Sequence, residues 1–209
     1  MRRLQQMVLI GVLVLVSGCM FQPPPPFELK PVMPDLAIAP SQKRLLKIAV
    51  VVQDPMPYTM FYQGEGSYSR DSTAEARNRG LLLERDLSRI SSETFSQVFS
   101  QVVVLRDLPQ PGQYDAVVNL NIGQVLLKEK VVLTGETCNL TASWSMSVLD
   151  NKNQEIFNKQ GTSPVHNFAW STMNPSATLT LGVNEHLSVI LGELAKEWGM
   201  TLYTLKIPT

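Results

Sequence analysis

Residues 138–148 read CNLTASWSMSV, from Cys138 to Val148, and their alternation is the strongest structural signal in the chain. Apolar side chains occupy every even position and small polar side chains every odd one. Because successive side chains of a β-strand point to opposite faces of a sheet, this pattern predicts a strand with one face in the core and one in water. Cys138 shares the apolar parity with Trp144 and Met146, so we expect it to be a buried, inert thiol.

Strand patterns continue on both sides of this stretch. Residues 150–153, DNKN, predict a turn, and residues 155–162 predict a return strand that completes a hairpin. Upstream, residues 116–133 alternate in the same way and predict another strand, bulged at Gly123. Shorter runs rich in β-branched residues predict two further strands, at 45–53 and 102–105.

Two segments carry apolar residues at helical spacing. The first runs from about Ala74 to Ser100, and its apolar stripe recurs at intervals of three and four residues. The second begins at about Val183 and is expected to stop at Gly199, with an edge strand or a packed tail after it. The order of elements predicts an α/β (α+β) domain, with a single mixed sheet of about four to five strands and two main helices packed on it.

Two stretches, residues 54–72 and 163–178, lack a clear period and are rich in aromatic and methionine side chains. Such side chains are enriched at interfaces, so the two stretches are candidate contact loops for a protein partner, lipid or a neighbouring copy. The alternative is that each loop folds back over its own sheet, with its aromatic side chains as a satellite core. The candidate contact residues are Tyr58, Met60, Phe61, Tyr62, Tyr68, Phe168 and Trp170.

The N-terminal sequence MRRLQQMVLIGVLVLVSGC, Met1–Cys19, has the features of a secretory signal. Two arginines precede an apolar run that is too short to span a membrane, and small residues lead to the cysteine. The sequence VSGC resembles the bacterial lipobox, which implies removal of residues 1–18 and acylation of Cys19. The alternative is an ordinary signal whose cysteine is incidental. In a cell with two membranes, Met20 in place of aspartate favours sorting to the outer membrane.

Residues 19–44 are rich in proline and follow neither the strand nor the helix period. Such a segment adopts extended polyproline conformations, so we expect a tether between the lipid and a periplasmic domain at 45–209. At about 3.1 Å per residue, it would hold the domain as much as roughly 75 Å from its anchor. Alternatively, the segment packs along a partner.

Charge and motif content argue against several functions. The chain has 18 basic and 18 acidic residues with no block of either sign, which argues against a nucleic-acid partner. His166, in a loop, and His186, on the last predicted helix, have no second residue at metal-ligand spacing. No GxSxG elbow is present, and the glycines around Glu65 lack a Walker lysine. We therefore expect no metal, no catalytic residue and no cofactor besides the covalent lipid on Cys19.

The strand Leu140–Asp150, the hairpin after it and the closing helix resemble the second half of the auxiliary lipoproteins of lipid-trafficking ABC-type systems. With its lipobox and tether, the chain is similar in outline to a wider group of accessory lipoproteins of Gram-negative envelopes. That group includes the lipopolysaccharide-assembly lipoprotein and the ring-forming lipoproteins of curli or polysaccharide export. The chain departs from the transport auxiliary group at residues 73–83, which hold no tryptophan, and the resemblance transfers no site residues.

The resemblance implies a non-enzymatic lipoprotein at the periplasmic face of the outer membrane. Such a subunit would bind or assemble with an envelope transport or secretion complex, or with copies of itself. Two alternatives remain open, a peptidoglycan-binding structural lipoprotein and a periplasmic hydrolase. The hydrolase would require His166 or His186 to meet a carboxylate or Cys138 at hydrogen-bond distance in a cleft.

Overall fold

Two long antiparallel strands, β4 (Ala116–Val132) and β5 (Gly135–Asp150), form the spine of the sheet. The structure is a computed structural model that describes residues 29–52, 60–65, 83–132, 135–170 and 175–208. The pairing register of β4 and β5 shifts between Ile122 and Val125, which confirms the bulge expected at Gly123. The alternation in residues 138–148 is confirmed as well, since every even position is buried and the odd ones are exposed or half-buried.

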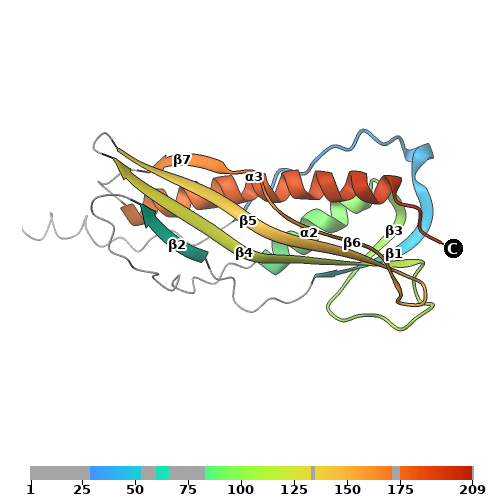
Figure 1. Cartoon of the computed structure of the whole chain (residues 1–209). Helices are drawn as coiled ribbons and strands as arrows, with labels where there is room; N and C mark the ends of the chain where they lie inside the picture. The colour runs from blue at the N-terminus through green and yellow to red at the C-terminus, as the bar shows by residue number, and fades with distance from the viewer. Residues whose placement is uncertain (1–28, 53–59, 66–82, 133–134, 171–174, 209) are drawn as a thin grey trace, which may run out of the picture.

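Five shorter strands flank this spine (Figure 1). β1 (Arg44–Val52) lies between β4 and β3 (Phe99–Leu105) and is parallel to both, while β6 (Glu155–Thr162) runs antiparallel to β5. Further along the spine, β2 (Met60–Glu65) pairs in parallel with β4, and β7 (His166–Trp170) pairs antiparallel with β5. The single mixed sheet is confirmed, but β2 and β7 raise its strand number to seven among the described residues.

β2 and β7 fall within segments that were expected to be irregular loops. They are six and five residues long, too short for an alternating pattern to stand out in sequence. Pairing with the extended spine supplies their backbone hydrogen bonds, so they need little intrinsic strand propensity. Residues 163–178 are therefore not a single loop, because they contain β7 and the start of the last helix.

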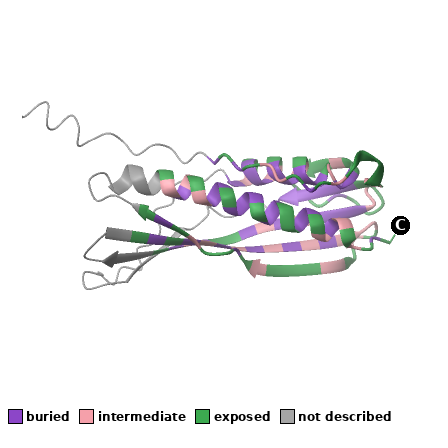
Figure 2. Cartoon of the chain, turned by 90° about the horizontal axis from the view of Figure 1, so that it is seen from above, coloured by how far each residue is buried: buried purple, intermediate pink, exposed green. Residues whose placement is uncertain are grey.

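The two main helices, α2 (Leu83–Phe95) and α3 (Pro175–Thr204), cover the same face of the sheet (Figure 1). From Leu181 to Thr204, buried and exposed positions recur with the turns of α3 (Figure 2). One core cluster fills the space between helices and sheet, and it includes the α2 stripe that the sequence predicted. Among the described residues, no helix is long and apolar enough to cross a membrane.

The helix boundaries differ from the sequence predictions. α2 ends at Phe95 instead of Ser100, because the chain turns directly into β3; residues 74–82 lie outside the described part. α3 passes through Gly199 and ends at Thr204, so the expected stop at Gly199 is wrong. A Cβ at that position would lie 2.7 Å from Leu36 Cδ1, so packing explains the glycine.

Arg44 at the start of β1 binds the C-terminus of α3. Its Nη1 donates to the carbonyl of Leu202 at 2.8 Å and to the carbonyl of Leu205. The last carbonyls of a helix have no partner within the helix and carry partial negative charge, so a cation is stabilising there. Burial lowers the pKa of the Arg44 guanidinium, whose carbon also lies 5.5 Å from the Phe99 ring centroid.

The folded domain begins before residue 45. Residues 29–39, here called the strap, lie against the helices, and Leu29 and Leu36 are 5% and 6% exposed. A short 3-10 helix, η1 (Pro40–Gln42), then leads into β1. The expectation of a tether reaching to residue 44 is therefore wrong for residues 29–44, because apolar side chains spaced along the strap enter the core. Residues 19–28 lie outside the described part of the chain.

Candidate functional site

No described helix covers the second face of the sheet, here called the open face. Its side chains come from the odd positions of β5 and the matching positions of the neighbouring strands. At the β1 end, Ala49, Val51 and Val117 form a small apolar cluster with Tyr114 packed against it. Beyond that cluster the open face is polar, and this polar part is the candidate site.

The polar part is built from cross-strand rows that only the register reveals. Asn121 of β4 pairs with Ser145 of β5, which pairs with Gln160 of β6. On one side, Asn119, Ser147 and Asn158 form a second row across the three strands. On the other side, Ser143 pairs with Thr162, and β4 contributes the bulge at Gly123 instead of a paired polar residue. Neighbouring strands are about 4.8 Å apart. We call this set of polar side chains the polar grid, and its members are Asn119, Asn121, Ser143, Ser145, Ser147, Asn158, Gln160 and Thr162.

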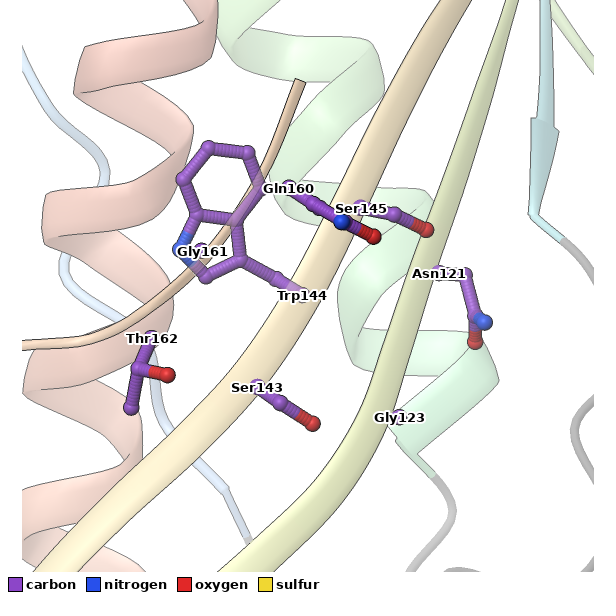
Figure 3. A pocket seen from close by; sticks show the side chains of 8 residues that line it. All are labelled: Asn121, Gly123, Ser143, Trp144, Ser145, Gln160, Gly161 and Thr162. Atoms are coloured by element: carbon purple, nitrogen blue, oxygen red, sulfur yellow. The ribbon is translucent and has the colours of Figure 1, made fainter. Parts of the chain in front are cut away.

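The polar grid is hollowed into two adjoining depressions, of about 410 and 220 Å³. Both are lined by the central row of Asn121, Ser145 and Gln160. Gly123 deepens the larger one, since it contributes no side chain and a Cβ there would lie 2.9 Å from Ser143 Oγ. In Figure 3 the two serines of this depression project away from the Trp144 indole, which lies on the side of the helices.

Several grid side chains already have partners, and others do not. Ser143 Oγ accepts a hydrogen bond from the backbone N–H of Gln124 at 2.6 Å, and Asn119 Nδ2 donates to Ser147 Oγ at 3.2 Å. Within the described residues, four grid side chains form no hydrogen bond: Asn121, Ser145, Gln160 and Thr162. Amides and hydroxyls both donate and accept, so this group suits an uncharged polar ligand such as a peptide backbone or a sugar. These groups supply no acid, base or activated nucleophile.

The predicted contact residues lie in three different settings. Met60, Phe61 and Tyr62 belong to β2, which pairs with β4 from Val125 onward and so lies just beyond the polar grid. Phe168 is 9% exposed in the core cluster, and its ring stacks on His186 with centroids 5.0 Å apart. Phe168 is therefore a residue of strand β7 that packs in the main core cluster. Trp170 pairs with Glu136 at the end of β7, and two residues lie outside the described part, Tyr58 and Tyr68. That these seven residues contact a partner stays a prediction.

The two histidines, separated in sequence, meet where β7 crosses α3. Their ring centroids are 5.9 Å apart, and His166 Nε2 lies 3.1 Å from Glu193 Oε2. Sequence spacing does not predict the contact between His166 and Glu193, because the two residues are 27 positions apart. The pair supplies the histidine–carboxylate contact that a hydrolase would need, but not the nucleophile or the oxyanion donors. Among the described residues, no group of three histidine, cysteine or acidic side chains is arranged to bind a metal.

Comparisons with known proteins give distant structural similarity only. No protein-family model matches the chain, and no curated protein matches it. A Xanthomonas campestris protein of the DUF330 family matches at 10% identity and a TM-score of 0.44, over 86% of this chain and 95% of that one. A putative neuraminyllactose-binding hemagglutinin homologue from Helicobacter pylori matches at 10% identity and a TM-score of 0.44, over 75% of this chain and 87% of that one.

A minor lipoprotein from Acinetobacter baumannii is a further structural relative, at 9% identity and a TM-score of 0.41. The match covers 77% of this chain and 92% of that protein. At TM-scores below 0.5 these similarities assign neither a family nor a function to this chain.

Proposed function

We propose that this chain is a non-enzymatic, lipid-anchored subunit of the bacterial envelope. It is held at the periplasmic face of the outer membrane and binds an envelope transport or secretion complex through the open face of its sheet. The observation that carries the proposal is the polar grid, in which four adjacent side chains have unused hydrogen-bonding groups (Figure 3). Because no described helix covers this face, its amide and hydroxyl groups can donate and accept hydrogen bonds to a partner.

The remaining parts of the proposal come from the sequence. The VSGC sequence supports lipidation of Cys19, which is the only attached group that the function requires. Without Arg2 and Arg3 of the signal, the chain has 16 basic and 18 acidic residues, a balance that fits a protein partner and not a nucleic acid. β2 extends the sheet next to the polar grid. By register Phe61 is opposite Leu126, a position on the open face, so of the three contact residues of β2 it is the one that would enlarge the binding region; Met60 and Tyr62 are opposite the core residues Val125 and Leu127.

The proposed surface can be tested by photo-crosslinking in cells. A photoreactive residue at Ser145, in the centre of the polar grid, should give an adduct of defined mass with an envelope protein. The same residue at Glu185, exposed on α3 on the opposite side of the sheet, is the matched control and should give none. Ser145→Arg should abolish co-purification of that partner from native membranes, while Glu185→Arg should retain it. Equal crosslinking at both positions would contradict the proposal.

A second variant tests the contact loops. Replacement of Tyr58, Phe61, Tyr62 and Trp170 by serine should weaken capture of the same partner if these aromatic side chains extend the binding region. If the folded variant captures the partner as well as the wild type does, the aromatic side chains are packing residues. Binding would then depend on the polar grid alone.

Peptidoglycan is the second candidate partner. The observation that favours it is the uncharged lining of the larger depression, because sugar hydroxyls are recognised by amide and hydroxyl groups. This candidate predicts that the mature protein co-sediments with purified peptidoglycan and that Ser145→Arg prevents it. Sedimentation that Ser145→Arg leaves unchanged would exclude the polar grid as a glycan site.

A further inference from the structure

The strap, residues 29–39, is hydrogen-bonded to α3 at its start and to Gln97, which follows α2, near its end. The backbone N–H of Lys30 donates to Ser188 Oγ at 2.9 Å. At the other end, the Gln97 side chain accepts a hydrogen bond from the N–H of Leu36 at 3.0 Å and donates one to the carbonyl of Pro34 at 2.8 Å. Two leucines of the strap belong to the core cluster, Leu29 and Leu36. The strap is thus part of the folded domain.

Two glycines inside α3 make room for the strap. A Cβ at Gly192 would lie 2.8 Å from the carbonyl oxygen of Val32, and a Cβ at Gly199 would lie 2.7 Å from Leu36 Cδ1. Glycine within a helix costs about 1 kcal/mol relative to alanine, so each glycine is unfavourable for the helix itself. Close approach of the strap explains both positions.

The strap runs in the same direction as α3. Lys30, Val32 and Leu36 contact Ser188, Gly192 and Gly199 in that order. The lipid-proximal end of the strap therefore lies near the middle of α3 and points toward its N-terminal half. That half packs on β7, where the Phe168 ring stacks on His186. Phe168 pairs with Cys138 near the start of β5, where β5 follows β4. We call this the hairpin end of the domain, after the hairpin of β4 and β5.

The opposite end of the domain is the one toward which the strap runs. It holds the turn at residues 150–153 and the C-terminus of α3, and we call it the turn end. From Ser188 to Thr204 the helix rises about 24 Å, at 1.5 Å per residue. Leu29 is ten residue steps after Cys19. At about 3.1 Å per residue these steps reach roughly 31 Å, less than half of what a free tether to residue 44 would allow.

The direction of the strap restricts how the domain can face a bilayer. Both ends of α3 are within reach of the linking residues, since Pro175 is about 20 Å and Thr204 about 24 Å from Ser188. To bring the turn end to the membrane, however, residues 19–28 would have to reverse direction at Leu29 and run back along the strap, which costs conformational entropy. Exposed apolar side chains do not decide the orientation, because they occur at both ends: Val165 and Leu181 at the hairpin end, and Leu45 and Leu108 at the turn end.

We propose that the strap orients the domain on the lipid bilayer, with the hairpin end toward the membrane and the turn end away from it. The proposal rests on the lipidation of Cys19 in the proposed function. The partner of the hairpin end is the bilayer surface. Because the strap lies on the helical side of the sheet, it does not cover the open face.

The orientation can be measured with the lipidated full-length protein in vesicles of phosphatidylethanolamine and phosphatidylglycerol that carry a headgroup quencher. Single fluorescent labels are placed at Leu181→Cys, at the hairpin end, and at Lys152→Cys, at the turn end, in a Cys138→Ala background; both label positions are exposed. The twelve residues of β5 between Cys138 and Asp150 correspond to about 40 Å. We expect the Leu181→Cys label to lose most of its fluorescence and the Lys152→Cys label to lose little.

A variant that releases the strap combines Leu29→Ser, Leu36→Ser and Gln97→Ala, with near-UV circular dichroism to check that the domain stays folded. It should make quenching at the two labels similar, whereas Val32→Ser, at a strap residue that is 73% exposed, should keep the difference. Equal quenching in the wild type, or a difference that survives strap release in a folded protein, would overturn the orienting role. Absence of the wild type from the vesicles would instead overturn the lipid anchor on which the proposal rests.

Discussion

Replacement of Gly199 by alanine should destabilise the protein, although alanine is the better helix former. In an unobstructed helix interior the substitution would gain about 1 kcal/mol. Here the new Cβ would lie 2.7 Å from Leu36 Cδ1 and 3.0 Å from Thr94 Cγ2. Leu36 is 6% exposed, and its displacement into water would lose about 2 kcal/mol of burial free energy. The expected net effect is a loss of about 1 kcal/mol in the free energy of unfolding.

A double-mutant cycle with Leu36→Ala isolates the cause. Leu36→Ala alone should cost about 2–4 kcal/mol, the usual range for a buried leucine. In that background the methyl group at residue 199 no longer meets a leucine side chain. Gly199→Ala should then stabilise the protein by about 1 kcal/mol, so its effect changes sign and the coupling between the two sites is about 2 kcal/mol.

Urea unfolding of the mature, unlipidated chain can measure all four proteins of this cycle. Trp198 is buried beside the substituted residue, so its fluorescence reports directly on the region. Near-equal slopes against urea would show that the denatured states are comparable. If Gly199→Ala stabilises both backgrounds by the same amount, Leu36 does not rest on Gly199, and the packing of the strap on α3 is refuted.

Three further predictions concern other parts of the fold. Arg44→Met should lower the free energy of unfolding by about 1.5–3 kcal/mol in a urea titration, because it removes charged hydrogen bonds from the end of α3; an unchanged midpoint would contradict this. Cys138 is 0% exposed, so in a Cys19→Ser variant, where it is the single thiol, an aromatic disulfide reagent should react only when the chain unfolds in urea; rapid reaction of the native variant would place the thiol at the surface. Gly182→Ala should displace the Phe168 ring, which lies against Gly182, and change the near-UV circular dichroism spectrum; an unchanged spectrum and midpoint would show that the ring packs elsewhere.

The sequence predicted those features that depend on local period. The alternation of Cys138 to Val148 predicted which face of β5 is buried, because a strand places successive side chains on opposite faces whatever lies around it. The turn and return strand at 155–162 and the bulge at Gly123 were found for the same reason. The α2 stripe followed from the helical period. The N-terminal signal is also a local pattern, and Cys19 lies outside the described residues.

The candidate site was visible only in part. The odd positions of β5 were expected to face water, which places Ser143, Ser145 and Ser147 on one face. The rows that join them to Asn121 and Gln160 depend on the register of three strands, and a shift of one residue would turn every side chain to the other face. Sequence alone therefore gave the polarity of the site but not its members.

Contacts between distant segments were decided only by the tertiary structure. The proline-rich strap carries no period, and its hydrogen bond from Lys30 to Ser188 spans 158 positions. Gly199 is read in sequence as a helix stop, but it is a point of close approach to Leu36. In the same way, His166 and Glu193 pair only because β7 crosses α3. Local periods follow from backbone geometry alone, whereas these contacts depend on which segments the whole core brings together.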